Sequence, residues 1–158
     1  MRLFRIVTAG IAAMLLTASA CCADVVVCFG DSITAGHDVT TPYPTYLQDL
    51  LDANSPGTEV INAGKGGEST INGISRIGGV LEQFAPQYVI IMEGANDVTG
   101  GVSPETTVFN LNNMLEQTLA AGAVPILSTI TPNSSSAGFQ PENYNPGIIT
   151  LARPTKHT

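Results

Sequence analysis

Residues 25–32 read Val25-Val26-Val27-Cys28-Phe29-Gly30-Asp31-Ser32. The first five are apolar and three of them are β-branched, which is typical of a strand buried on both faces of a parallel sheet. The run then reaches a glycine and an acid, a typical turn, and Ser32 follows directly. A serine at a turn from a strand into a helix exposes its hydroxyl and its own N–H to the same space. This stretch therefore predicts a parallel sheet and a candidate nucleophile, Ser32.

Three further short runs predict strands at 59–62, 88–92 and 124–129. Between the strands, apolar residues recur at helical spacing, and Ser103 followed by Pro104 is a typical helix start. Strand and helix alternate four times, so the sequence predicts an α/β fold with a mainly parallel sheet between helical layers. The apolar positions that predict the helices are Tyr46, Leu47, Leu50 and Leu51, then Ile71, Ile74, Ile77, Leu81 and Phe84, and then Val108, Leu111, Leu115 and Leu119.

After the last predicted strand the sequence becomes irregular. Residues 131–146 are rich in Pro, Ser, Asn and Gly, which predicts a loop, and a further helix is expected to begin at Ile148. We expect residues 24–152 to form one domain, followed by a short tail at 153–158.

Polar or glycine-rich segments follow three of the four predicted strands, at 30–32, 62–69 and 94–97. Binding groups gather at the carboxyl ends of strands in such sheets, so the three segments are expected to meet. Each segment alone has an ordinary structural explanation: aspartate and serine stabilise turns, glycines form flexible or anion-binding loops, and Asn96 can cap a turn. Their convergence is what favours a functional site.

The three segments resemble the sequence blocks of the GDSL/SGNH hydrolases. Phe29-Gly30-Asp31-Ser32-Ile33-Thr34 looks like the first block, and Asn62-Ala63-Gly64-Lys65-Gly66-Gly67-Glu68-Ser69 is similar to the second. Gly94-Ala95-Asn96-Asp97 resembles the third. The blocks occur in order, each after a predicted strand, and the match covers about residues 24–152. The resemblance implies a three-layer α/β/α fold with a flavodoxin-like sheet.

The resemblance also implies roles for the matched residues. Ser32 would be the nucleophile of a carboxylic ester hydrolase. The backbone N–H groups of Ser32 and Gly67 and the side-chain amide of Asn96 would form the oxyanion hole, in which one donor contributes about 3 kcal/mol. Members of this family hydrolyse small-molecule esters and thioesters of lipids, aryl alcohols or acetylated sugars, without a metal or organic cofactor. Supporting positions are implied at Asp31, Asn62, Gly64, Gly66 and Asp97.

The family's fourth element is absent, namely an Asp-x-x-His near the C-terminus that supplies the general base. His157 has Pro154 three positions before it instead of an acid, and we interpret it as a tail residue. His37 is interpreted as an exposed loop histidine. We therefore expect a truncated or frame-shifted member without the last strand and closing helix, of little or no activity. A non-catalytic module that binds an acylated glycan or lipid is the main alternative.

Residues 1–20 have the pattern of a secretory signal peptide. Arg2 and Arg5 precede an apolar run at 6–16, and small residues follow. This run is shorter than the about 20 residues of a membrane span. Cleavage at the end of the segment would leave a soluble protein, whereas a weak lipobox would give a lipid-anchored Cys21. Both alternatives predict an exported protein, periplasmic or extracellular.

The composition excludes some classes of partner. Without the signal segment four basic and thirteen acidic residues remain, so nucleic acid is not expected as a partner. The cysteines have no metal-binding spacing, because two are adjacent at 21–22 and Cys28 lies in a predicted strand. A flavodoxin-like nucleotide or phosphate binder that uses residues 64–67 is a weaker alternative, since Lys65 is the only positive charge expected nearby.

Overall fold

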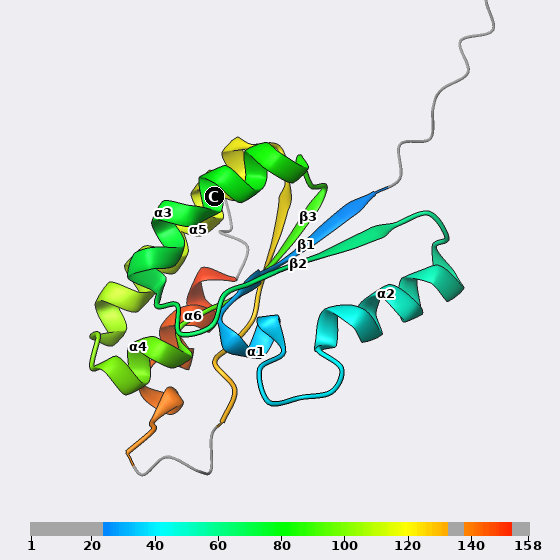
Figure 1. Cartoon of the computed structure of the whole chain (residues 1–158). Coiled ribbons are helices and arrows are strands. Elements are labelled where there is room, and N and C mark those ends of the chain that lie inside the picture. The colour runs from blue at the N-terminus through cyan, green and yellow to red at the C-terminus, as the bar shows by residue number, and fades with distance from the viewer. Residues whose placement is uncertain (1–23, 133–137, 153–158) are drawn as a thin grey trace, which may run out of the picture.

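The computed structural model describes residues 24–132 and 138–152 of the chain (Figure 1). Its strands are β1 (Val25–Gly30), β2 (Glu59–Gly64), β3 (Tyr88–Met92) and β4 (Val124–Leu127). They form one sheet in the order β2-β1-β3-β4, and every neighbouring pair is parallel. The predicted α/β fold with a parallel sheet is confirmed, and the order matches the first four strands of a flavodoxin-like sheet.

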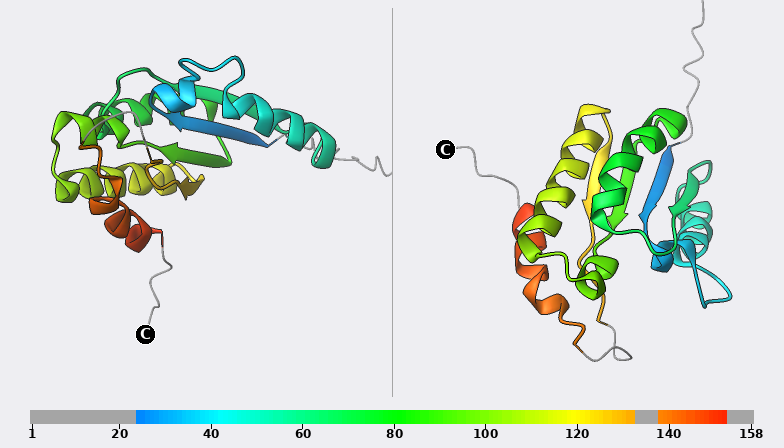
Figure 2. Two further views of the ribbon diagram at one scale, coloured as in Figure 1. Left: turned by 90° about the horizontal axis from the view of Figure 1, so that it is seen from below. Right: turned by 60° about the vertical axis from the view of Figure 1, so that its left-hand side comes forward.

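Helices cover both faces of the sheet. On one face α3 (Thr70–Phe84) and α5 (Pro104–Ala120) pack side by side, and on the opposite face α2 (Tyr43–Asn54) lies next to β2 (Figure 1, Figure 2). The three layers expected from the resemblance are therefore present. The remaining helical segments are α1 (Ser32–Ala35), α4 (Ala95–Gly100), the 3-10 helix η1 (Pro141–Asn143) and α6 (Asn145–Leu151).

Some elements differ from those the sequence predicts. The short helix α4 was not predicted; it begins directly after Gly94, whose φ of +114° lets the chain reverse from β3 into a helix. The segment at 131–146 is less irregular than expected, since η1 and the start of α6 fall within it. Asn145 accounts for part of this order, because its side chain accepts from the Ile130 N–H at 2.9 Å and donates to the Ile130 C=O at 3.1 Å.

The main hydrophobic core lies between the sheet and the layer of α3 and α5. Alternate residues of β1 and β3 point toward these helices, and burial of each such side chain stabilises the fold by about 1.5–3 kcal/mol. Cys28 is fully buried on the other side of β1, and this burial raises the pKa of its thiol to about 11. The fully or almost fully buried core residues include Val27, Phe29, Val89, Ile91, Ile77, Leu81, Leu111 and Met114.

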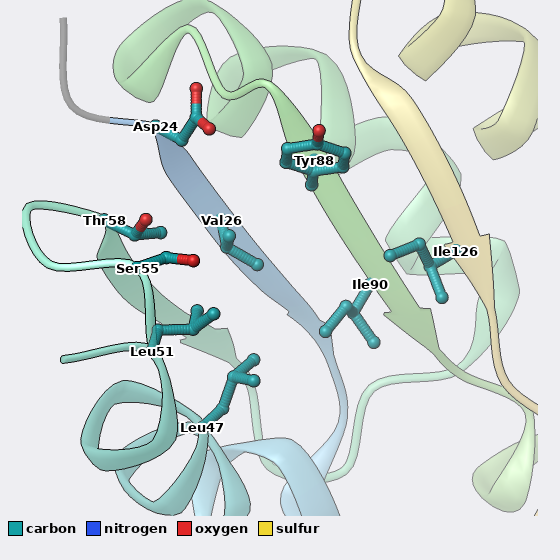
Figure 3. A pocket seen from close by; sticks show the side chains of 9 residues that line it. All are labelled: Asp24, Val26, Leu47, Leu51, Ser55, Thr58, Tyr88, Ile90 and Ile126. Carbon is teal, nitrogen blue, oxygen red and sulfur yellow. The ribbon is translucent and has the colours of Figure 1, made fainter. Parts of the chain in front are cut away.

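The opposite face of the sheet is only partly covered. Leu47 and Leu51 of α2 border a pocket of about 310 Å³ above Val26 and Ile90 (Figure 3). Ile126 of β4 also lines this pocket and remains 48% exposed. The pocket is largely apolar and extends to the amino ends of β1 and β3, whereas the polar turns lie at their carboxyl ends.

None of the described helices is long and apolar enough to cross a membrane. The predicted signal segment at 1–20, the alternative anchor Cys21 and the tail at 153–158 lie outside the described residues.

Two glycines set the spacing between the ends of the strands and the turn after β1. A Cβ atom on Gly64 would lie 2.1 Å from the backbone N of Ala35, and one on Gly30 would lie 2.4 Å from the backbone O of Met92. A side chain at either position would force rigid backbone apart. The close approach of α1 to β2 therefore requires a glycine at the end of β2.

We expect the substitution Gly64→Ala to lower the free energy of unfolding by about 3 kcal/mol or more, because the added methyl group collides with backbone rather than with a movable side chain. Urea denaturation followed by circular dichroism measures this change. The matched control is Gly79→Ala in α3, where nothing lies within 4 Å of the added Cβ. That control is expected to stabilise the helix by about 0.5–1 kcal/mol, and an equally mild Gly64→Ala would contradict the steric argument.

Candidate active site

The three polar turns meet at the carboxyl edge of the sheet because β1 lies between β2 and β3. Asn96 connects them. Its Nδ2 donates to the backbone O of Glu68, in the loop after β2, at 2.7 Å. The same nitrogen lies 3.4 Å from Oδ2 of Asp31, in the turn after β1. One amide group thus contacts both neighbouring turns, and the predicted convergence of the three turns is observed.

Ser32 occupies the turn after β1 as the first residue of α1. The preceding Asp31 caps this helix, since its Oδ1 accepts a hydrogen bond from the Ile33 N–H at 2.9 Å. Gly36 caps the end of this helix, and its N–H donates to the Ser32 C=O at 3.0 Å. Ser32 therefore sits at a sharply turned position. It lines a pocket of about 150 Å³ together with Ile33, Ala95, Asn96, Thr99, Thr131 and Phe139.

The loop after β2 presents a second exposed backbone amide. Asn62 shapes the end of β2, directly before this loop, by accepting the Gly64 N–H on its Oδ1 at 2.9 Å. Gly67 has a φ of +73°, a left-handed conformation that favours glycine, and it is exposed. Within residues 24–132 and 138–152, neither the Ser32 N–H nor the Gly67 N–H donates a hydrogen bond. Both N–H groups are therefore available to a ligand.

The two histidines do not form a general base in the described part of the chain. The His37 ring lies over Gly66, where an added Cβ atom would be 2.2 Å from its Cε1. His37 is exposed, and no described acid pairs with it. His157 lies outside the described residues. The described residues also hold no group of three or more His, Cys, Asp or Glu side chains suited to a metal ion.

Asp97 is fully buried and joins the turn after β3 to the start of α3. Its Oδ2 accepts the Thr70 N–H at 2.9 Å, and its Oδ1 accepts the hydroxyl of Thr70 and, at 3.1 Å, that of Thr107. Asn110 completes the network by donating to the Thr70 hydroxyl at 3.0 Å. The resemblance implied a supporting position at Asp97, and in the structure Asp97 holds the first residue of α3.

A partly buried ion pair that sequence reasoning did not identify supports the loop after β2. The Nε of Arg76 donates to Oε2 of Glu68 at 2.7 Å, and its Nη1 donates to the Ala63 C=O at 2.9 Å. Lys65 lies 3.4 Å from the other oxygen of Glu68. The expectation that Lys65 is the only positive charge near this loop is therefore wrong. Both cations pair with Glu68, Arg76 through hydrogen bonds and the largely exposed Lys65 at 3.4 Å.

Four acidic side chains are buried at this edge of the sheet: Asp31, Glu68, Glu93 and Asp97. Sequence reasoning gave no role to Glu93, which directly follows β3. Burial, followed by the charges of Asp31 and Glu68, raises the pKa of Glu93 to about 9. Desolvation also raises the pKa of Asp31. An acid between an aliphatic strand and a glycine turn is the sequence signal that could have identified Glu93.

We expect Asp97→Ala to destabilise the fold by about 3 kcal/mol, because it leaves a buried N–H and two buried hydroxyls without their acceptor. Chemical denaturation measures the loss. Asp49→Ala, at an exposed position of α2, is the matched control and is expected to stay within about 0.5 kcal/mol of the wild type. Equal effects of the two substitutions would show that the Asp97 network contributes little.

Comparisons with known proteins agree with this geometry. The GDSL-like lipase/acylhydrolase family matches residues 28–156. Thioesterase 1/protease 1/lysophospholipase L1 of Escherichia coli is 33% identical over 119 residues, which are 74% of this chain and 56% of that protein. The uncharacterized lipoprotein YqeF of Bacillus subtilis is 34% identical over 117 residues, 68% of this chain and 48% of that protein. The chain thus spans about half the length of these relatives.

Solved structures are similar as well. The crystal structure of AlinE4, an SGNH-hydrolase family esterase, superposes with a TM-score of 0.72 at 30% sequence identity. The superposition covers 82% of this chain and 71% of AlinE4. The family match spans all three turns at the carboxyl edge of the sheet, and the structural similarity extends over the surrounding layers. The chain belongs to the GDSL-like lipase/acylhydrolase family.

Proposed function

We propose that this chain carries the nucleophile and the oxyanion-binding groups of a serine hydrolase that cleaves carboxylic esters or thioesters through an acyl-enzyme. The pocket that Ser32 shares with Asn96 carries the proposal, because it brings a hydroxyl and an amide donor to one small space. Membership of the family and the names of the relatives, a thioesterase and lysophospholipase and an esterase, support the substrate class.

In the proposed reaction the Oγ of Ser32 attacks the acyl carbon, and the carbonyl oxygen becomes an oxyanion. The N–H groups of Ser32 and Gly67 and the Nδ2 of Asn96 donate to this oxygen, each contributing about 3 kcal/mol in the transition state. The alcohol or thiol then leaves with a proton. Water hydrolyses the resulting serine ester and regenerates Ser32.

Asn96 is suited to this role because its amide has two hydrogens. One is held by the backbone O of Glu68, which fixes the plane of the amide. The second makes a long, weak contact with Asp31 at 3.4 Å, which orients the amide but can give way to an oxyanion. In the proposal Asp31 and Asp97 act by holding backbone in place, and Asn62 and Gly64 shape the loop that presents Gly67.

Ser32 also needs a base to accept its proton. The sequence has no Asp-x-x-His, and no histidine paired with an acid occurs among the described residues. We therefore propose that this 158-residue chain binds and polarises an ester but hydrolyses it slowly. Loss of the histidine from a serine triad lowers turnover by about 10⁴- to 10⁶-fold.

A p-nitrophenyl acetate assay tests this proposal. The chain is expected to show only slow hydrolysis, and added imidazole is expected to raise the rate by serving as the missing base. The rate measured with Ser32→Ala in the same buffer gives the direct hydrolysis by imidazole, which is subtracted from the rate of the wild type. The difference between the two proteins is the rate that depends on Ser32, and a difference of zero at every imidazole concentration would contradict the proposal.

Two further variants sharpen this assay. Asn96→Ala is expected to lower the imidazole-rescued rate by about 10²- to 10³-fold, as for the loss of one oxyanion donor. Asn113→Ala, at a partly exposed position of α5, is the matched control and should leave the rate unchanged. Fast hydrolysis without imidazole that is abolished by Ser32→Ala would instead show that the chain contains a base we have not recognised.

No histidine paired with an acid occurs among the described residues, and this observation favours a second candidate function, a non-catalytic module that holds an acylated glycan or lipid in the same pocket. This alternative predicts that the chain binds such a ligand in isothermal titration while imidazole produces no hydrolysis dependent on Ser32. Rescued hydrolysis would favour the esterase, and binding without rescued hydrolysis would favour the module.

We further propose that the protein is exported, on the basis of the charged, apolar and small-residue order of residues 1–20. The lipoprotein name of the Bacillus subtilis relative supports Cys21 as a lipid anchor. Intact-mass measurement of the mature protein distinguishes the alternatives. An acylated chain that begins at Cys21 would establish the anchor, and an unmodified chain cleaved after Ala20 would exclude it.

A further inference from the structure

Glu93 occupies a position where a carboxylate is strongly disfavoured. Its side chain is 2% exposed, and neither carboxyl oxygen has a hydrogen-bond partner in the part of the chain that the structure describes. Buried polar groups are normally hydrogen-bonded, and an unpaired buried charge is more costly still. We therefore take the Glu93 side chain to be protonated and neutral. Its O–H group can donate a hydrogen bond, but no described residue accepts it.

The charges around Glu93 favour the same protonation state. The negative charges that raise the pKa of Glu93 come from Asp31 in the turn after β1, Glu68 in the loop after β2 and Asp97 in α4. The positive charge of Arg76, in α3, is the only one of these charges that favours ionisation of Glu93. Glu93 thus lies among three acids and one cation.

The other three acids have donors of their own. Arg76 pairs with Glu68, Asp97 accepts a backbone N–H and two hydroxyls, and Asp31 accepts a backbone N–H. Arg76 and the largely exposed Lys65 both pair with Glu68, and two cations on one acid do not neutralise four carboxylates in a region of low dielectric constant, so the cluster retains a proton. Glu93 holds that proton because it lacks donors.

A small cavity connects Glu93 to Asp31. It has a volume of about 10 Å³, about enough for one water molecule, and both acids line it. On its other side, Asp31 accepts the Ile33 N–H and lies 3.4 Å from the amide nitrogen of Asn96. A group that holds the Asp31 carboxylate in place therefore also helps to hold the turn that carries Ser32 and the amide of Asn96.

We propose that Glu93 is a positioning residue of this site: as the neutral acid it donates its proton through one water molecule to the Asp31 carboxylate, and so orients the Ser32 turn and the Asn96 amide. The catalytic consequence rests on the proposed function, whereas the protonation of Glu93 and its coupling to Asp31 do not. Ionisation of Glu93 replaces this hydrogen bond with repulsion between two carboxylates. The site is expected to loosen as the pH rises toward about 9, the pKa of Glu93.

Carbon-detected NMR of the full chain tests the proposal without any turnover. The side-chain carboxyl carbon of Glu93 is expected to titrate near pH 9, and the carboxyl carbon of Asp31 and amide carbon of Asn96 should shift with the same midpoint. In Glu93→Gln these two shifts should disappear. Glu82→Gln, at an exposed position of α3, is the matched control and should leave both shifts in place.

Thermal unfolding provides a second measurement. The pKa of Glu93 is raised from 4.5 to about 9 in the folded chain, so between these values the folded state holds a proton that the unfolded state has lost. The stability contributed by Glu93 is therefore complete below pH 4.5 and is lost as the pH rises to about 9. The Tm of the wild type is expected to fall relative to that of Glu93→Gln across this range.

The imidazole-rescued assay tests the catalytic consequence. Glu93→Gln keeps an N–H donor and should retain most of the rate that depends on Ser32, without the decline above pH 9. Glu93→Leu keeps the volume but has no donor, and its kcat is expected to fall about tenfold or more with little change in KM.

Failure of this inference is distinguishable from failure of the proposed function. If Glu93 titrates as an ordinary carboxyl group, or if Asp31 and Asn96 respond to pH identically in Glu93→Gln, the positioning role is wrong even where Ser32 is active. Equal rates for Glu93→Gln and Glu93→Leu would also overturn it. If Ser32→Ala changes no rate but the coupled shifts are present, the proposed function fails and the Glu93–Asp31 coupling stands.

Discussion

The guanidinium of Arg76 holds the edge of the sheet on which the site is built. It reaches from α3 to the carboxylate of Glu68 and to the C=O groups of Ala63 and Gly30, at the ends of β2 and β1. Its Cζ also lies 4.0 Å from the centre of the Phe29 ring. Arginine suits this position because its planar fork of donors satisfies several acceptors while keeping its charge. The backbone O of Glu68 also accepts a hydrogen bond from the side-chain amide of Asn96. The residue that pairs with Arg76 is therefore also bonded to the turn after β3.

Such a pair contributes more to specificity than to stability. The cost of removing two charges from water offsets most of the attraction between them, but a partner left alone would be a buried unpaired charge. Glu68 is 2% exposed, so it requires Arg76 wherever the loop takes this conformation. A different conformation of the loop would separate Glu68 from Arg76 and leave a buried carboxylate without its cation. The cost of that separation favours the conformation in which Gly67 lies beside the other two turns.

Sequence reasoning predicted the parts of the fold that depend on local pattern. The apolar run at 25–29 indicated β1, and Ser103 and Pro104 marked the start of α5, where the Ser103 side chain accepts the Thr106 N–H. Polar residues at three strand ends indicated where the turns would meet. The interactions that hold these turns join residues far apart in the chain, as for Asp97 and Thr70, and no periodicity reveals them. Glu93 was missed for the same reason, because its chemistry depends on acids from other elements.

The described contacts determine where Ser32 lies, but they do not determine how reactive its hydroxyl is. Backbone hydrogen bonds, the cap from Asp31 and the close packing at Gly64 fix the turn that carries Ser32. All of these contacts lie within the turn after β1 and α1, or between α1 and the end of β2. Preorganised donors stabilise an oxyanion without moving, so this part of the site needs no contribution from a base. The Ser32 hydroxyl is different, because its nucleophilicity depends on where its proton goes. A family member can therefore keep the oxyanion-binding geometry intact while its rate depends on a separate element.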